Sequence, residues 1–357
     1  MLAAVLERYF RERYPFAARR QAACDCPGVN RERWAELGEL GLAASLFQPE
    51  RGGYGGDGFD IMLAFEQLGR ALATEPFLGS LMVGQALAEA GHPELESVVS
   101  GRVIVALAHQ ERQGDAVEVL ATRAAPHENG WVLDGAKAVV PQAESADWFL
   151  VSAHAPRGLT LFAVPAIAPG LSIRGYLNIE GGRSGDLLLE DVPVGPGALV
   201  GTEGVGVPLL ERALDAGLLA LSAEALGIMD VLMTSTLDYL RTRIQFNQPI
   251  ARFQALQHRM AELALELEQA RSSVINAAAA FNGAHAGKTQ LALSAAKYTA
   301  GSTGTLIAQE AIQLHGAIGM TWDLPLSHYA KRLIMIGHQL GDEDHHLARF
   351  IRASRER

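Results

Sequence analysis

The sequence predicts a mainly helical α+β protein with an N-terminal helical domain, a middle antiparallel β-barrel or sandwich, and a C-terminal four-helix bundle. Two changes in hydrophobic periodicity support this prediction. Helical spacing gives way to short β-branched runs near residue 101, and it returns near residue 205. Apolar residues make up 49% of the 357 residues, which is enough for buried cores. We therefore expect domains over 1–100, 101–204 and 205–357.

The N-terminal zone shows helix signals at both ends of its segments. Asn30 is a good N-cap for a helix that contains Trp34, and Gly41 is a good stop for it. A glycine-rich stretch then leads into the apolar helix IMLAFEQLGRALA. Gly53-x-Gly55-x-x-Gly58 matches the dinucleotide-binding string, but that fingerprint requires a preceding strand, and here it lies between helices. We therefore assign it no nucleotide.

The middle zone consists of short runs that are rich in β-branched residues. The turn signals Asn129-Gly130 and Asp134-Gly135 separate some of them. This spacing is typical of a small antiparallel barrel or sandwich. The runs are RVIVALA, AVEVLATRA, GWVLDGAKAVV, DWFLVSA and GLTLFAVPA.

Long helical patterns fill the C-terminal zone. They run from about Pro208 to Arg243, from Phe253 to Phe281 and from Lys288 to Leu314, and a fourth begins near Pro325. Four long helices with short connections favour an antiparallel bundle.

Charge and cysteine content exclude several classes of protein. The formal net charge of −10 argues against nucleic-acid binding, which depends on cations that neutralise phosphates. Cys24 and Cys26 are too close in the chain for an unstrained disulfide. No stretch reaches the roughly 18 uncharged apolar residues of a membrane span. We expect a cytoplasmic protein that binds neither nucleic acid nor membrane.

Potential metal ligands gather near the C-terminus, where His338, Asp342 and His345 share one helical face. An acid-rich first turn of a helix explains the same residues through the helix dipole, and no matching motif stands elsewhere. We therefore predict no metal site.

A corner between two long helices carries the clearest binding signal. The segment from Arg243 to Gln254 places a cation and Phe246 next to a proline turn. An arginine there can hold a pyrophosphate, and the ring can pack on a planar group. A C-terminal arginine that complements the helix dipole is the alternative explanation.

With these motifs, the chain strongly resembles the acyl-CoA dehydrogenase family. RIQFNQPIARFQALQHRMAEL is similar to the family pattern R-x-Q-F-G-x-P-I-x-x-F-Q-x-x-Q-H-x-L-A-D. IQLHGAIGMTWDLPLSHYAKR resembles I-Q-x-H-G-G-x-G-[FY]-x-x-E-x-P-x-x-R-x-x-R. RWAELGELGLAASLFQPERGGYGG and GWVLDGAKAVV extend the likeness to nearly the whole chain.

The resemblance implies FAD, bound across a subunit interface. Residues that match the pyrophosphate and adenosine contacts of an FAD held mainly by a neighbouring subunit are Arg243, Phe246 and Gln254. A second cofactor-lining strip of the family is matched by Gln313, Gly316 and Ala317. The flavin contacts differ. The family's Thr-Glu-Pro-Gly-x-Gly-Ser-Asp loop reads AHQERQGD over 108–115, and its Trp-Ile-[TS] tripeptide reads Val139-Val140-Pro141. Pro141 lacks the N–H and hydroxyl expected near the flavin.

The family's catalytic base is a glutamate, and neither of its two known places holds one here. Counting from Pro325, Gln339 falls on the position between the last two helices, where an amide cannot act as a general base. Gly217 falls on the alternative position in the first bundle helix. Asp215 and Asp342 are the nearest carboxylates, and neither aligns.

One hypothesis accounts for both departures. The chain resembles the smaller subunit of heterotetrameric bacterial acyl-CoA dehydrogenases of steroid side-chain or dicarboxylate breakdown. It would complete the FAD site of a larger α2β2 partner that carries the glutamate, forms trans-2-enoyl-CoA from an acyl-CoA, and passes electrons to an electron-transfer flavoprotein. A self-sufficient homomeric dehydrogenase with a displaced base, a reduced-flavin monooxygenase, and a non-catalytic acyl-CoA-binding or assembly protein remain alternatives.

Overall fold

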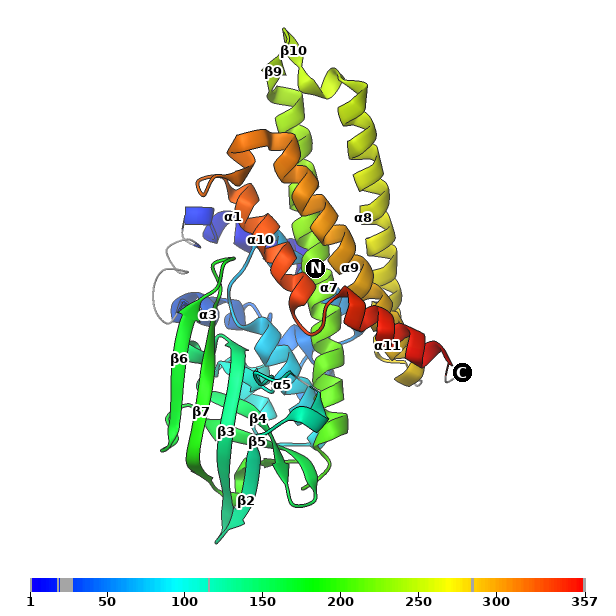
Figure 1. Ribbon diagram of the computed structural model, residues 1–357. Coiled ribbons are helices and arrows are strands. Elements are labelled where there is room, and N and C mark those ends of the chain that lie inside the picture. Colours follow the sequence, from blue (N-terminus) through cyan, green and yellow to red (C-terminus); the bar gives the residue numbers. More distant parts are fainter. Residues whose placement is uncertain (1, 18, 20–27, 115, 284–285, 356–357) are drawn as a thin grey trace. The chain divides into compact units, whose positions relative to one another are not determined.

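The computed structural model describes residues 2–17, 19, 28–114, 116–283 and 286–355 (Figure 1). Cys24 and Cys26 lie outside these residues. The chain divides into two compact units, one of residues 1–16, 57–73 and 218–357, the other of residues 17–56 and 74–217. Helices and one large sheet make up these units, so the predicted α+β class is confirmed.

The first unit is entirely helical apart from one short hairpin. Its helices correspond to the predicted bundle, with two N-terminal helices and a C-terminal helix added. They are α1 (Leu2–Arg13), α4 (Gly58–Ala71), α7 (Gly206–Thr242) from residue 218 onward, α8 (Gln254–Phe281), α9 (Ala286–His315), α10 (Pro325–His338) and α11 (Glu343–Arg355).

Glycines in helix interiors let α4 pack tightly against α7. A Cβ on Gly69 would lie 2.1 Å from the carbonyl oxygen of Glu224, and one on Gly227 would lie 2.0 Å from that of Glu66. No larger residue fits at either place, which explains glycine where a helix prefers alanine. Beside this contact, Arg271 of α8 donates to Asp230 of α7 at 2.6 Å.

Helix α7 is long and apolar enough to cross a membrane by length and composition, a property that the count of uncharged residues did not reveal. However, 83% of its most apolar window is buried within the protein. The apolar side chains of α7 therefore belong to a protein core.

The second unit combines helices with an eight-stranded sheet in the order β6-β7-β3-β2-β4-β5-β8, and β1 pairs with β4. All neighbouring strands are antiparallel except β1–β4 and β2–β4. The helices are α3 (Arg31–Glu39), α5 (Phe77–Ala90) and α6 (Leu95–Val99). The strands are β1 (Val105–Ala108), β2 (Arg123–His127), β3 (Gly130–Pro141), β4 (Trp148–Ala155), β5 (Gly158–Pro165), β6 (Leu171–Leu177), β7 (Arg183–Val194) and β8 (Leu199–Val200).

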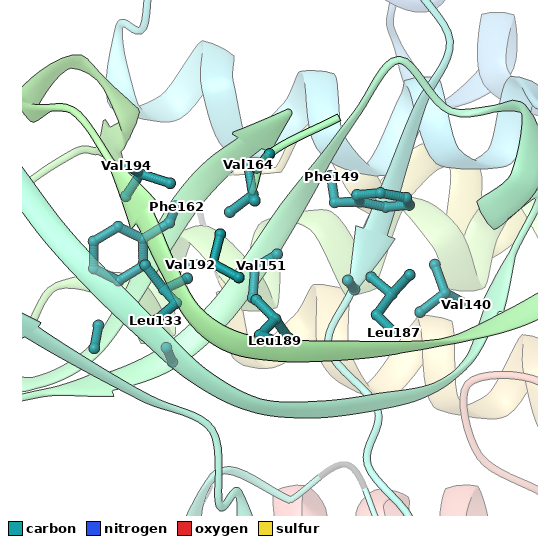
Figure 2. Close-up of a cluster of buried hydrophobic side chains, with 14 of the residues drawn as sticks. Leu133, Val140, Phe149, Val151, Phe162, Val164, Leu187, Leu189, Val192 and Val194 are labelled. Carbon is teal, nitrogen blue, oxygen red and sulfur yellow. The ribbon is translucent and has the colours of Figure 1, made fainter. Parts of the chain in front are cut away.

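Alternating side chains of these strands form the core of the β unit. Figure 2 shows Phe149, Phe162 and Leu187 within this cluster, and each is at most 1% exposed. Period-two alternation places such residues of each strand on one face of the sheet.

Two predictions in the middle zone are wrong. Most of AVEVLATRA is not a strand, because Val117–Val119 form a 3-10 turn and β2 starts only at Arg123. Asp134-Gly135 is not a turn between strands but a bulge inside β3. Gly135 adopts φ +146°, and its Cβ would lie 2.7 Å from the Cα of Thr122, so the glycine serves a close backbone approach.

Candidate active site

The corner after α7 is a two-residue hairpin. Strands β9 (Ile244–Gln245) and β10 (Gln248–Pro249) are joined by Phe246 and Asn247, whose φ values are +51° and +61°. Positive φ at both positions is typical of the type I′ turn, in which asparagine is tolerated in place of glycine. The turn holds the Phe246 ring in solvent, where it is 84% exposed.

The second predicted strip lies at the same end of the bundle. The His315 ring at the end of α9 stacks on Tyr239 near the end of α7, with ring centroids 4.4 Å apart and planes at 22°. This contact joins the end of α9, where the 3-10 segment Gly316–Met320 begins, to the last turns of α7 before the hairpin. All six predicted cofactor contacts are exposed: Arg243, Phe246, Gln254, Gln313, Gly316 and Ala317. Among the described residues, none hydrogen-bonds to the Arg243 guanidinium.

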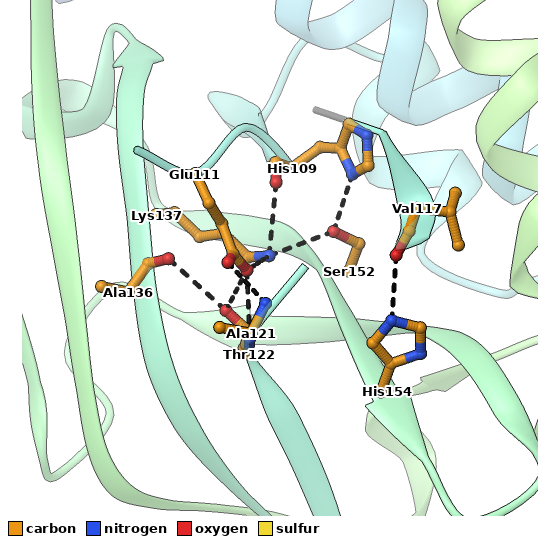
Figure 3. A network of polar contacts seen from close by, with 9 residues as sticks. All are labelled: His109, Glu111, Val117, Ala121, Thr122, Ala136, Lys137, Ser152 and His154. Atoms are coloured by element: carbon orange, nitrogen blue, oxygen red, sulfur yellow. Dashed lines mark hydrogen bonds and ion pairs between the residues drawn. The ribbon is translucent and has the colours of Figure 1, made fainter. Parts of the chain in front are cut away.

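The loop that replaces the family's flavin-binding loop is fixed by a buried ion pair (Figure 3). The Glu111 carboxylate accepts from Lys137 Nζ at 2.8 Å, and these two side chains are 3% and 0% exposed. It also accepts from Thr122 Oγ1 at 2.6 Å and from the backbone N–H of Ala121 at 2.6 Å. Lys137 Nζ further donates to Ser152 Oγ, which contacts His109 Nδ1 at 2.9 Å.

This network shifts the pKa of both partners. Burial raises the pKa of Glu111, but the hydrogen bonds from Lys137, Thr122 and Ala121 outweigh it and hold the pKa at about 2. Burial lowers the pKa of Lys137 to about 8, although the Glu111 carboxylate acts in the opposite direction. Sequence reasoning noted Glu111 only as a mismatch and missed the pair. A lysine in the apolar run GAKAVV was the available signal, because a buried charge requires a partner.

The segment that replaces the family's tripeptide uses its backbone within the chain. Val139 adopts φ +55°, at a bulge between Lys137 and Val140. Its N–H donates to Asp186 Oδ1 at 3.2 Å, and Pro141 has no N–H to donate. No described residue from Val139 to Pro141 offers a hydroxyl.

Neither of the predicted base positions bears a carboxylate. Gln339 follows α10, and its amide oxygen accepts from Arg332 Nη1 at 3.0 Å. The same guanidinium donates to both oxygens of Glu224, at 2.6 and 2.8 Å. The one glycine of this turn, Gly341, is preceded by Leu340, so a shift of one residue also brings no carboxylate.

The two nearby aspartates have other roles. Asp342 accepts from the backbone N–H of His345 at 2.9 Å at the start of α11, and this hydrogen bond lowers its pKa. Asp215 and the buried Gly217 lie on α7 in the other unit, where Asp215 interacts electrostatically with Arg212. No group of three His, Cys, Asp or Glu side chains within the described ranges is arranged to hold a metal ion.

The turn that carries Gln339 is held from inside the protein. Lys297, 1% exposed, donates to the carbonyls of Gly337 and Gly341 at 3.1 and 2.9 Å. His346 Nε2 donates to the carbonyl of Leu340 at 2.9 Å, which defines its neutral tautomer. Burial lowers the pKa of Lys297 to about 8 and that of His346 to about 4. The turn is therefore rigidly positioned.

The residues present fit one end of an FAD molecule. An exposed guanidinium and an exposed aromatic ring suit a pyrophosphate and a planar base. At the flavin end, the donors that would contact the ring are replaced or already bonded within the chain. The residues at the flavin end therefore do not fit the flavin ring of FAD.

Nearly the whole chain is similar to known proteins. Residues 1–102, 106–192 and 204–354 match the N-terminal, middle and C-terminal domains of acyl-CoA dehydrogenases. The acyl-CoA dehydrogenase FadE27 of Mycobacterium tuberculosis is 30% identical, and the match covers 84% of this chain and 82% of that protein. The human mitochondrial short-chain specific enzyme is 28% identical, over 85% and 81% of the two chains.

Two solved structures are similar in fold and in sequence. A variant of the Tcur3481-Tcur3483 steroid ACAD aligns with a TM-score of 0.90 and 30% identity, over 99% of this chain and 97% of the other. The ChsE4-ChsE5 complex from Mycobacterium tuberculosis aligns with a TM-score of 0.90 and 26% identity, over 100% and 96%. The chain belongs to the acyl-CoA dehydrogenase family, whose members are FAD-dependent oxidoreductases that act on CH–CH bonds.

Proposed function

We propose that this chain is a subunit of a heteromeric acyl-CoA dehydrogenase in which it completes the FAD site of a larger partner. The partner supplies the flavin pocket, the acyl-CoA site and the catalytic glutamate. A bound FAD would supply the acceptor for the hydride of the acyl Cβ, the partner's glutamate would take the Cα proton, and an electron-transfer flavoprotein would take up the electrons. This chain contributes the corner after α7 and the strip after α9.

The contrast between the two ends of the cofactor site carries this proposal. The adenosine-end residues lie exposed at one end of the bundle, with the Phe246 ring 84% in solvent. Exposed apolar rings at a defined turn are typical of surfaces that a partner covers. By contrast, Glu111 and Asp186 bond to donors of this chain at the flavin end, and Gln339 cannot remove a proton.

Two of the similar structures support the proposed assembly. The ChsE4-ChsE5 structure is described as a complex, and the Tcur3481-Tcur3483 protein is described as a steroid ACAD. These descriptions favour a two-chain assembly and a bulky acyl substrate for the present chain.

Cofactor content of purified protein tests the proposal. The chain purified alone should hold almost no FAD, and the complex co-purified from its native source should hold FAD and bleach with acyl-CoA. Stoichiometric FAD and acyl-CoA bleaching in the chain alone would establish the homomeric alternative instead. A native chain with no partner and no turnover would favour the non-catalytic one.

The Arg243→Ala substitution tests the assigned role of the corner. We expect it to lower the FAD occupancy of the complex about tenfold or more, because a charge-assisted contact with pyrophosphate is lost. Arg241→Ala is the matched control, since Arg241 is an exposed arginine of the same helix end that pairs with Asp238. Equal occupancy in both variants would contradict the role of Arg243.

A further inference from the structure

The β unit carries a pocket of about 550 Å³ beside the loop that replaces the family's flavin-binding loop. Strands β3, β7 and β6 form its floor, and the turn at Arg112 and Gln113 lies at its rim. Its volume is within the range of pockets that hold small organic ligands.

The pairing of residues between β3, β7 and β6 shows which side chains form the floor of the pocket. Ala136, Leu188 and Ser172 are direct neighbours across the three strands, so their side chains share one face of the sheet. Asp186 and Arg174 pair two residues further along and share that face. Small and aliphatic side chains therefore form an apolar platform with one guanidinium beside it.

A rigid turn supplies the second guanidinium. Glu111 and Gly114 exchange two backbone hydrogen bonds, of 2.9 and 3.0 Å, which close a loop with Arg112 and Gln113 at its tip. The buried Glu111 carboxylate anchors this loop through Lys137 and Thr122 (Figure 3). The replacement of the family's flavin loop has thus placed an arginine at the rim of the pocket in a fixed position.

The charge of the lining selects a class of ligand. The Glu111–Lys137 pair is internally neutral, and Asp186 offsets one of the two arginines, so one net positive charge remains. Neither guanidinium forms a hydrogen bond or an ion pair with another described residue. Asp186 Oδ1 already accepts hydrogen bonds from Val139 N–H and from Tyr176 Oη. This single carboxylate therefore does not make the pocket a cation site.

We propose that this pocket binds an apolar monocarboxylic acid, with its body on the Ala136–Leu188 platform and its carboxylate held by Arg112 and Arg174. A guanidinium presents paired donors that match a carboxylate in geometry. A nucleoside diphosphate brings at least two negative charges against one net positive charge, so it suits the pocket less well. The pocket is lined by the loop that replaces the family's flavin-binding loop, so this proposal rests on the inference that no flavin binds at this end of the chain.

A fluorescence titration of the full chain with dansyl-undecanoate tests the proposal. The wild-type protein should bind the acid at least about tenfold more tightly than its methyl ester, which is the equivalent of one charge-assisted hydrogen bond. Arg112→Gln and Arg174→Gln should each remove most of this difference. Arg123→Gln, an exposed arginine of β2 outside the pocket, should leave it unchanged.

Three outcomes would overturn the proposal. The first is equal binding of the acid and its ester to the wild-type protein. The second is binding that persists unchanged in Arg112→Gln and Arg174→Gln, because the probe then occupies another apolar site. The third is displacement of the probe by ADP at equal concentration, which would make the pocket a nucleotide site. FAD content, measured in the same samples, separates these outcomes from a failure of the subunit proposal.

Discussion

The corner after α7 and the loop from His109 to Gly114 correspond to the two ends of one cofactor site in the family, yet they are built in opposite ways. At the corner, Arg243 and Phe246 extend into solvent, and the guanidinium has no partner within the described chain. In the loop, Glu111 and Lys137 are buried and bonded to each other. The corner thus leaves its polar groups open to a ligand, whereas the loop satisfies its buried polar groups within the chain.

The largest expected effect comes from breaking the loop. Lys137→Met leaves the Glu111 carboxylate buried and uncompensated, so we expect a loss of about 3–5 kcal/mol in the free energy of unfolding. The double variant Glu111→Gln with Lys137→Met should recover much of this loss. Urea unfolding, followed by circular dichroism, measures both. Equal stability of the single variant and the wild type would show that the loop is not held by this pair.

Acid should destabilise the protein in two adjacent pH windows. The folded chain keeps His346 neutral down to about pH 4, whereas the unfolded imidazole takes up a proton near 6.5, so unfolding binds a proton and stability falls as pH falls from 6.5 to 4. Glu111 acts likewise between pH 4.5 and 2. We expect about 3 kcal/mol from each group.

Replacing His346 by Gln should flatten the upper window, because the amide donates to Leu340 without titrating. His345→Gln is the matched control, since this neighbour is exposed. A slope between pH 6.5 and 4 that survives in His346→Gln would assign the acid sensitivity to other groups.

A smaller effect is expected at the exposed corner, where little of the fold depends on any side chain. Asn247→Val places a β-branched residue at φ +61° and should cost roughly 1–2 kcal/mol locally. Asn247→Gly should change stability by less than about 0.5 kcal/mol. Thermal unfolding gives the stability, and the FAD content of the complex should fall in the valine variant only. Identical FAD content would mean that the turn does not orient Arg243.

The smallest effect is expected from placing a glutamate at position 339, which should add no dehydrogenase activity. Gln339→Glu puts a carboxylate next to the Arg332 guanidinium, which holds the pKa of an acidic neighbour low and weakens it as a base. Purified Gln339→Glu protein, supplied with FAD and acyl-CoA, should therefore show no flavin bleaching. Bleaching would demonstrate that the missing glutamate is the chain's main defect.

Local sequence signals predicted helices and strand existence well. Asn30 caps α3 as expected, with its side chain accepting from the N–H of Arg33 at 2.9 Å. The failures come from contacts between strands: Gly135 signals a turn locally, but the approach of Thr122, which precedes the neighbouring strand β2, decides its role. The Glu111–Lys137 pair spans 26 positions, and no local pattern specifies such a contact. Motif residues such as Arg243 could be proposed from the sequence because their pattern is contiguous, and their cofactor role stays a prediction.

Arg332 links the Gln339 position to the stability of the helical unit. Its guanidinium bridges Glu224 and Gln339, so the position that the resemblance assigns to the base lies beside a permanent cation. Replacing Arg332 by a neutral residue would leave Glu224 with a buried and uncompensated negative charge. Any substitution that removes this cation from the Gln339 position is therefore expected to lower the stability of the helical unit.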